Sequence, residues 1–213
     1  MNIKKWTLNP FQQNSYVLWD QDGTAIFVDC GYYSSQELEK LYTFISDNKL
    51  NPTAIVLTHA HLDHTFGALD ISEKYKLQVY MHKGDLDILN TNEKQAAKYG
   101  LNPRKAPIDI VFIQETQVLE FGSIKLSISH VPGHSPGSIS LYVQSMNSVF
   151  TGDVLFKDSI GRTDLPGGNF ETLQHSIRTH LYILPQDTAV YSGHGPETTI
   201  GDEAKFNPYV RNY

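Results

Sequence analysis

The sequence has a single cysteine, Cys30, among its 213 residues. One thiol cannot form an intramolecular disulfide, and such a scarcity of cysteine is typical of proteins from a reducing compartment. We therefore expect a cytoplasmic protein whose stability depends on its apolar core. Cys30 lies far along the chain from the candidate metal ligands described below, so we interpret it as a core residue and not as an attacking thiol.

The sequence also lacks an excess of basic residues and any long apolar run. Lysine and arginine together number 17 against 23 acidic residues, which gives a formal net charge of −6 and a pI near 5.8. Such a chain has no sequence-wide positive field for nucleic acid. No window is apolar enough for a membrane span, and residues 1–10 hold no apolar stretch of signal-peptide length. We therefore expect neither nucleic acid nor a membrane as a partner.

The apolar pattern predicts a mixed α and β fold in one domain, residues 1–213, since a chain of this length with 40% hydrophobic residues can bury a sizeable core. Residues 15–19 and 24–28 flank an Asp-Gly turn signal and predict an antiparallel hairpin. Ser34 and Glu37 have the spacing of a capping box and predict a helix that ends near Asp47. Further strands and helices are expected at 53–57, 67–75, 77–81, 117–121, 124–130, 170–184 and 199–206.

Residues 83–107 are polar and weakly periodic, and Pro103 and Pro107 interrupt any helix there. Two interpretations fit this region: a mobile wall over a site, or ordinary surface helices with a connector. We favour the second. His82, which follows the expected strand at 77–81 without a neighbouring donor, is interpreted as a surface histidine.

Three histidines and an aspartate lie within six residues, directly after the apolar strand expected at 53–57: His59, His61, Asp63 and His64. Side chains two apart in an extended chain point the same way, so His59 and His61 can bind one metal ion. A catalytic zinc usually takes three protein ligands, so four donors indicate two ions. The alternative is a histidine-rich surface loop that binds metals weakly.

Further donors recur downstream, each just after an expected strand and each beside a glycine. These are His134 after Gly133, Asp153 after Gly152, and His194 after Gly193. A glycine allows the backbone to turn sharply where it approaches a metal ion. This recurrence favours a built metal site over an accidental histidine-rich loop.

These segments resemble the metallo-β-lactamase superfamily and, within it, the glyoxalase II-like hydrolases. The resemblance covers nearly the whole chain, and the matching segments are Thr58–His64, Pro132–Ser138, Thr151–Phe156, Gly161–Leu165 and Ser192–Gly195. It implies a four-layer αββα sandwich, with two β-sheets packed face to face, helices on both outer sides and metals at one edge of the sheets. The apolar pattern alone supports only the mixed α and β class.

The resemblance also implies which residues bind which ion. One ion would be held by His59, His61 and His134, the other by Asp63, His64 and His194, and Asp153 would bridge them together with a hydroxide. A carboxylate can bridge because it carries two oxygens and a negative charge. We expect two divalent ions, zinc first, with iron or manganese also compatible with these donors.

Asp63 itself and four other residues are candidates for further roles around this site. Asp63 is expected to be catalytic, orienting the nucleophile or taking a proton. Asp29 either supports the site through hydrogen bonds, as in the resembling family, or is a plain turn residue. His130 falls on the apolar face of its strand, which favours a hydrogen-bonded supporting residue over a ligand. Arg162 either binds a substrate carboxylate or pairs with a neighbouring aspartate, and Lys157 is either a substrate contact or a solvated lysine.

The function implied by the resemblance is hydrolysis of a small anionic thioester of the S-acylglutathione type by metal-bound hydroxide. The alternatives are a persulfide dioxygenase with a single iron, a lactonase or other ester hydrolase, and a metal-binding protein without activity. Full-length glyoxalase II enzymes use a helical C-terminal region for glutathione, and the 19 residues after His194 have room for one short helix. We therefore expect the reaction type to be better defined than the thiol. The sequence gives no indication of the oligomeric state.

Overall fold

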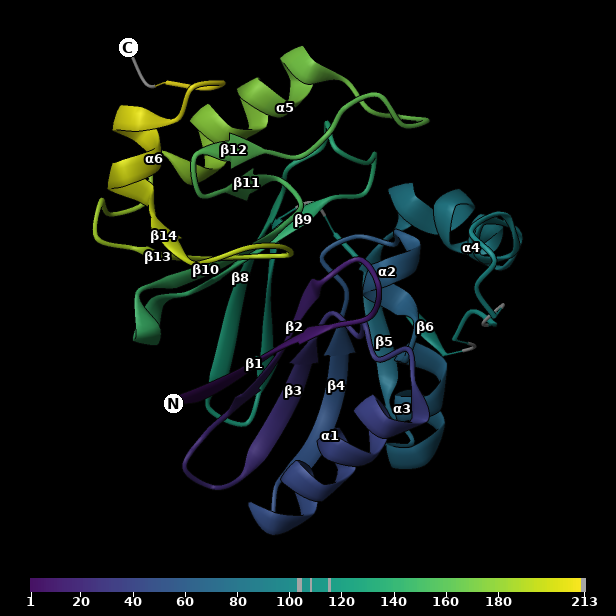
Figure 1. The fold of residues 1–213 in the computed structure, drawn as a ribbon. Helices are drawn as coiled ribbons and strands as arrows, with labels where there is room; N and C mark the ends of the chain where they lie inside the picture. Colours follow the sequence, from purple (N-terminus) through teal and green to yellow (C-terminus); the bar gives the residue numbers. More distant parts are fainter. Residues whose placement is uncertain (103–104, 108, 115, 212–213) are drawn as a thin grey trace.

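The computed structural model describes residues 1–102, 105–107, 109–114 and 116–211. Within them, two six-stranded sheets pack face to face (Figure 1). The first contains, in spatial order, β1 (Asn2–Leu8), β2 (Gln13–Trp19), β3 (Thr24–Val28), β4 (Asn51–Val56), β5 (Gln78–His82) and β6 (Ile110–Ile113). The second contains β14 (Thr198–Thr199), β13 (Ala189–Ser192), β10 (Ser148–Gly152), β9 (Ile139–Val143), β8 (Ile124–His130) and β7 (Thr116–Phe121). A small ribbon pairs β11 (Leu155–Phe156) with β12 (Ser159–Ile160).

Helices cover the outer face of each sheet (Figure 1). The first sheet carries α1 (Ser35–Asp47) and α3 (Ala68–Tyr75), and the second carries α5 (Phe170–Ser176) and α6 (Ile200–Phe206). The buried side chains form one cluster between the sheets and one under each helical layer, and a small fourth cluster contains Leu62, Phe66 and Ala96. This is the four-layer αββα arrangement that the resemblance predicted. The two remaining α-helices, α2 (Leu62–Thr65) and α4 (Leu86–Lys98), lie at one edge of the sandwich.

Local signals in the sequence correctly placed the hairpin of β2 and β3 and the first helix. β2 and β3 pair antiparallel across the expected turn. At α1, the Ser34 hydroxyl accepts from the Glu37 amide at 3.2 Å, and the Glu37 carboxylate accepts from the Ser34 amide at 2.8 Å. The apolar stripe of α1 is buried on the sheet, so the expected helix to Asp47 is confirmed.

Parallel pairing brings the ends of several strands to one edge of the sandwich. β3, β4, β5 and β6 run parallel to one another in the first sheet, and β10 runs parallel to β13 in the second. The carboxyl ends of parallel strands meet at the same edge of a sheet. The histidine-rich segment after β4 and the Asp153 and His194 segments after β10 and β13 therefore converge.

One expected helix differs in form, and β1 and β6 lie in segments for which the sequence predicted no strand. The helix expected over 170–184 is α5 followed by a π-helical turn, Ile177–Leu181, in which the Tyr182 amide donates to the Ile177 carbonyl at 2.9 Å. Its apolar residues Leu173, Ile177 and Leu181 are nevertheless buried. Residues 83–107 contain the helix α4, as the favoured interpretation expected, and Pro103 lies outside the described residues. Among the described helices, none has the length and apolar composition to cross a bilayer.

Candidate metal centre

The loop after β4 places the first donors. Its last strand residue is Val56, and His61 then takes the N-cap position of the short helix α2, which carries Asp63 and His64 in its single turn. His59 and His64 are buried, whereas His61 and Asp63 are half-buried. The segment therefore directs its donors inward while leaving His61 and Asp63 open to a ligand.

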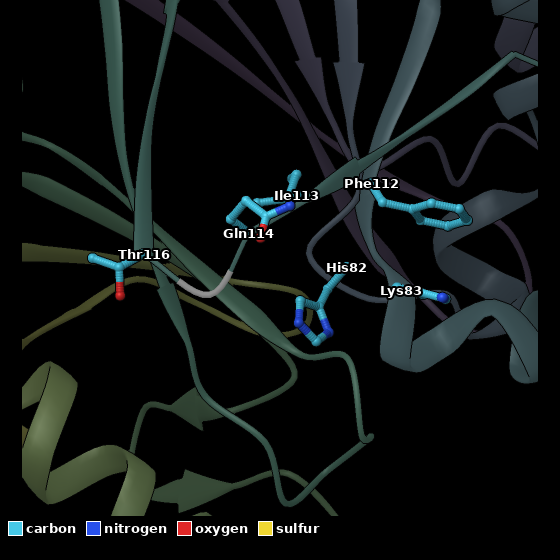
Figure 2. A pocket seen from close by; sticks show the side chains of 6 residues that line it. All are labelled: His82, Lys83, Phe112, Ile113, Gln114 and Thr116. Carbon is cyan, nitrogen blue, oxygen red and sulfur yellow. The ribbon is translucent and has the colours of Figure 1, made fainter.

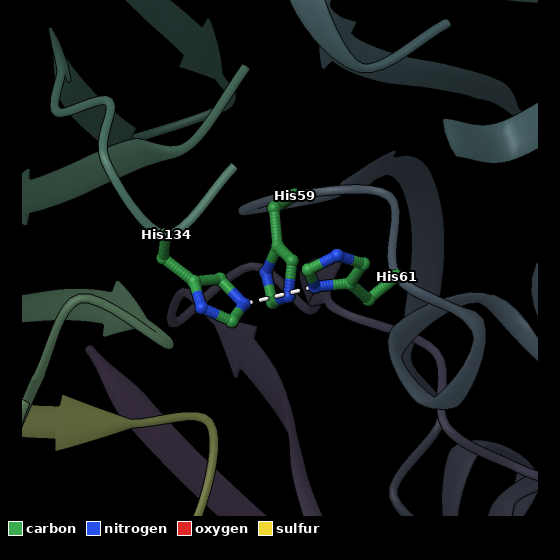
Figure 3. A group of neighbouring side chains, drawn as sticks. All are labelled: His59, His61 and His134. Carbon is green, nitrogen blue, oxygen red and sulfur yellow. Dashed lines mark hydrogen bonds between the residues drawn. The ribbon is translucent and has the colours of Figure 1, made fainter. Parts of the chain in front are cut away.

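A group of three imidazoles forms the first candidate ion site. His59, His61 and His134 offer ring nitrogens that all lie within 4.8 Å of one another. The Nδ1 atom of His61 is 2.8 Å from the Nε2 atom of His134, and Figure 3 shows the three rings turned toward a common point. Their rings are nearly perpendicular, with centroids 4.6 to 4.9 Å apart.

A second group lies beside the first and includes carboxylates. The His194 Nε2 atom is 3.1 Å from the Asp63 Oδ2 atom, and the His64 Nε2 atom is 3.7 Å from the same oxygen. Asp153 lies between the two groups. Its Oδ1 atom is 3.3 Å from His64 Nε2, and its Oδ2 atom is 3.8 Å from His134 Nε2 and 3.5 Å from His194 Nε2. All seven side chains expected from the sequence therefore meet in one place.

Unsatisfied buried atoms show that this donor set fits cations. The His59 Nε2, His64 Nε2 and Asp153 Oδ1 atoms are buried and have no hydrogen-bond partner among the described residues. A buried polar atom without a partner is costly, by about 1–3 kcal/mol. Nitrogen and carboxylate donors in groups of three are the ligands that zinc and similar divalent ions take in proteins. Bound cations would satisfy all three atoms.

The protonation of His59 and His61 suits metal binding, whereas neighbouring carboxylates outweigh burial at His64 and His194 and raise the pKa of these two rings. Burial and the neighbouring His134 imidazole lower the pKa of His61 to about 4, so its ring is neutral at pH 7. Burial also lowers the pKa of His59, with His64 as the next cause. A histidine must be neutral to bind a metal. Burial tends to raise the pKa of Asp153, but the imidazoles of His64 and His194 outweigh it and lower the value, so this carboxylate is ionised.

Close contacts with neighbouring side chains require glycine at the positions before Asp153 and His194. Gly152 has φ +50°, and a Cβ atom there would collide with the Thr58 side chain. A Cβ atom at Gly193 would collide with the Asp153 carboxylate and with the His64 ring. The glycines that the sequence places next to these donors therefore let the backbone come close to the site.

Asp29, at the end of β3, is both a turn residue and a support of the site. It has φ +57°, and its Oδ2 atom accepts from His64 Nδ1 at 2.8 Å. It also accepts from the backbone amide and the hydroxyl of Thr58, each at 2.8 Å. Donation from Nδ1 leaves the Nε2 lone pair of His64 directed at the site, which fixes the tautomer needed for a metal ligand.

Asp85 is a supporting residue that the sequence reasoning missed. It is fully buried at the start of α4, and its carboxylate accepts from the Ala60 amide at 2.9 Å, the Ser135 hydroxyl at 2.8 Å and the Gly137 amide. It thereby ties the histidine-rich loop to the loop of His134. The sequence did contain a signal for Asp85, because this acidic residue follows the strand expected at 77–81 by four positions. The other site residues also follow expected strands.

Gln13 was also missed. It is buried at the start of β2, and its Nε2 atom lies 3.3 Å from His64 Nδ1 while donating to the Asn14 carbonyl at 2.7 Å. Nothing local in the sequence marks it, because its partner is 51 residues away. It packs against the ring that Asp29 orients.

His130 and His82 lie beside the site but not in the donor groups. The His130 Nε2 atom is 2.8 Å from the Pro136 carbonyl, and this contact holds the loop of His134 in place. The His130 ring stacks on the His82 ring, with centroids 4.1 Å apart. His82 also faces a separate cavity of about 480 Å³ near β6 (Figure 2). None of the seven donors lines that cavity.

The segment after Asp153 contributes through its backbone. The Arg162 carbonyl accepts from His134 Nδ1 at 2.8 Å. The Arg162 guanidinium forms a two-point ion pair with Asp164, at 2.7 and 2.8 Å, on an exposed loop. The sequence left two interpretations of Arg162 open, binding of a substrate carboxylate or pairing with a neighbouring aspartate. The structure contains the pairing with the aspartate. Lys157 is exposed.

Comparisons with known proteins agree with this geometry. The model of the metallo-beta-lactamase superfamily matches residues 8–194. The chain is similar to the hydroxyacylglutathione hydrolase GloC of Haemophilus influenzae, with 37% identity over 214 residues, covering 100% of this chain and 99% of the relative. It is also similar to the probable metallo-hydrolase YqgX of Bacillus subtilis, with 40% identity over 216 residues and the same coverage.

Two solved structures resemble the fold over its full extent. The B3 metallo-beta-lactamase BLEG-1 has a TM-score of 0.90 at 38% identity, covering 99% of this chain and 100% of that one. TTHA1623 in a di-iron-bound form has a TM-score of 0.88 at 37% identity, covering 97% and 100%. The match of the family model, the full-length relatives and the convergence of the seven donors lead to one conclusion: the chain belongs to the metallo-beta-lactamase superfamily of metallohydrolases.

Proposed function

We propose that this protein hydrolyses thioesters of the S-acylglutathione type with two divalent cations bound, zinc being the expected metal and iron or manganese the alternatives. The observation that carries the proposal is the position of the Asp153 carboxylate between two groups of donors, which suits a ligand shared by two ions. The similarity to a hydroxyacylglutathione hydrolase supports the substrate class. The di-iron form of a similar structure supports two ions and leaves their identity open.

The bound ions would supply a hydroxide nucleophile near pH 7 and positive charge for the oxyanion that forms on the carbonyl. The chain's own residues prepare the reaction. Burial tends to raise the pKa of Asp63, but the imidazoles of His64 and His194 lower it, so its carboxylate is ionised. An ionised carboxylate accepts a hydrogen bond from the nucleophile and orients it. A lowered pKa favours this orienting role over proton storage.

Hydrolysis of a thioester does not need a separate proton donor for the leaving group. A free thiol has a pKa near 8.5, so a thiolate leaves without prior protonation. His61 lines a cavity of about 840 Å³, which lies within the usual range of roughly 300–1,000 Å³ for small-molecule sites. The substrate would therefore reach the donors from the side of His61.

The test is elemental analysis of the native protein combined with an activity screen. We expect two transition-metal ions per chain and hydrolysis of S-lactoylglutathione at neutral pH. The screen also contains a lactone, a β-lactam and glutathione persulfide. One iron per chain with oxygen uptake on the persulfide would overturn the proposal in favour of a dioxygenase, and full metal content without turnover of any compound would favour a metal-binding protein.

Replacing Arg162 with alanine tests its role toward anionic substrates. The guanidinium is close to Tyr99, which lines the cavity beside His61. We expect Arg162→Ala to raise KM about two- to fivefold for an anionic thioester and less for a neutral one, because exposed charge pairs contribute little. Arg162→Lys, which keeps the charge, serves as the control. An equal rise for both substrates would argue against carboxylate binding by Arg162.

A further inference from the structure

The cavity beside His61 has one wall that comes from α4. The cavity is also lined by Leu165, Pro166, Gly167 and Pro136, which are uncharged and can pack against a ligand but cannot distinguish ligands by charge. Apart from His61 of the metal centre, the ionisable lining residues that are charged at pH 7 are Asp87, Lys94 and Lys98, and all three belong to α4.

The residues of α4 that line the cavity form one face of the helix. Asp87, Thr91, Lys94 and Lys98 follow at intervals of four, three and four residues, and all four line the cavity. Side chains at these intervals lie on one face of an α-helix. The opposite face, with Leu89, Asn92 and Ala96, is buried against the protein. The cavity face of α4 therefore carries one acidic and two basic residues in a fixed order.

The two lysines are available to a ligand. Lys94 and Lys98 are exposed, and no ion pair joins either of them to another residue in the described part of the chain. Two like charges at this spacing on a helix repel each other. A ligand carboxylate placed between them would relieve this repulsion.

We propose that the cavity face of α4 binds the thiol half of the substrate, a peptide thiol of the glutathione class, with Lys94 and Lys98 on its glycine carboxylate and Asp87 on its ammonium group. The proposal rests on the thioester hydrolysis proposed above. The glycine carboxylate and the ammonium group of glutathione lie at opposite ends of the tripeptide, as the lysines and Asp87 lie at opposite ends of this helix face. Asp87 and Lys94 are seven residues apart, about 10 Å along the helix axis, and an extended tripeptide spans about the same length.

Removing both lysine charges tests the proposal. We expect Lys94→Gln/Lys98→Gln to raise KM for S-lactoylglutathione about five- to tenfold and to leave kcat unchanged, because the lysines bind the substrate away from the reacting carbonyl. KM for the neutral thioester S-lactoyl-N-acetylcysteamine should stay the same. The control is Lys40→Gln/Lys205→Gln, which removes two exposed lysines from α1 and α6 on the outer layers. Circular dichroism melting checks that both double variants are folded.

Asp87→Asn tests the ammonium contact separately. We expect this variant to raise KM for S-lactoylglutathione about threefold. KM for N-acetyl-S-lactoylglutathione should stay unchanged, since acetylation of the amino group removes the ammonium charge. The same rise for both thioesters would contradict the role of Asp87. A coenzyme A thioester whose KM depends on the lysines, when that of the glutathione thioester does not, would overturn the assignment of the ligand.

A binding measurement separates failure of this proposal from failure of the proposed function. S-methylglutathione is a thioether and cannot be hydrolysed, so calorimetry reports its binding whether or not the protein is a thioesterase. Absence of thioester turnover, with binding that weakens in the lysine double variant, would overturn the function and keep the assignment of α4. Turnover with unchanged KM and unchanged binding in the double variant would overturn the assignment alone.

Discussion

Asp153→Asn should remove metal and activity together. The substitution keeps the size of the side chain but replaces a shared anionic ligand with a neutral amide, whose nitrogen cannot coordinate. Asp153 approaches His64, His134 and His194 at 3.3 to 3.8 Å, so its loss affects both donor groups. Loss of a partner that only supports a metal ligand costs about 10–100-fold in affinity or activity. We expect thioester hydrolysis to fall by at least about a hundredfold and metal content to fall below one ion per chain.

The matched control is Asp164→Asn, an exposed aspartate eleven positions along the same loop region that pairs with Arg162. It should retain full metal content by elemental analysis. His61→Ala removes one donor from the first group only, and it should lose metal and activity as well. Normal metal content in Asp153→Asn, with normal turnover, would show that the carboxylate is not a shared ligand.

The parts of the fold that the sequence predicted are those that depend on neighbours along the chain. The capping box of Ser34 and Glu37 joins residues three apart, and the hairpin of β2 and β3 turns at Asp22 and Gly23. The donors were recognisable for the same reason. Each follows an expected strand, and parallel strands deliver their carboxyl ends to one edge, so placing the strands largely places the donors.

The parts that the sequence could not predict depend on contacts between distant segments. Asp85 accepts from Ala60 and Gly137, which lie 25 and 52 residues away. Gln13 is close to His64 only after folding. The role of Arg162 toward His134 runs through its carbonyl, and a backbone contact leaves no mark on residue type. Similarly, the weakly periodic sequence of residues 83–107 left two interpretations open, and the one that was not favoured, a wall over the site, describes the position of α4 beside His61.

Asp85→Ala should have the largest effect on stability of the changes considered. The carboxylate is fully buried and accepts from two backbone amides and one hydroxyl. Its removal leaves three buried donors without partners, at about 1–3 kcal/mol each before relaxation. We expect the free energy of unfolding to fall by about 3–5 kcal/mol and Tm by roughly 10 °C or more. Urea unfolding and thermal melts measure both changes.

The same substitution should also weaken the metal site, although Asp85 contacts none of the seven donors. It joins the loop of His59 and His61 to the turn of His134, so its loss lets the three imidazoles of the first group move apart. We expect metal affinity to fall about 10–100-fold, as for other supporting partners of metal ligands. Asp87→Asn, two residues along and exposed, should change neither stability nor affinity. Equal metal affinity in Asp85→Ala and Asp87→Asn would show that packing alone, without this carboxylate, holds the two loops in register.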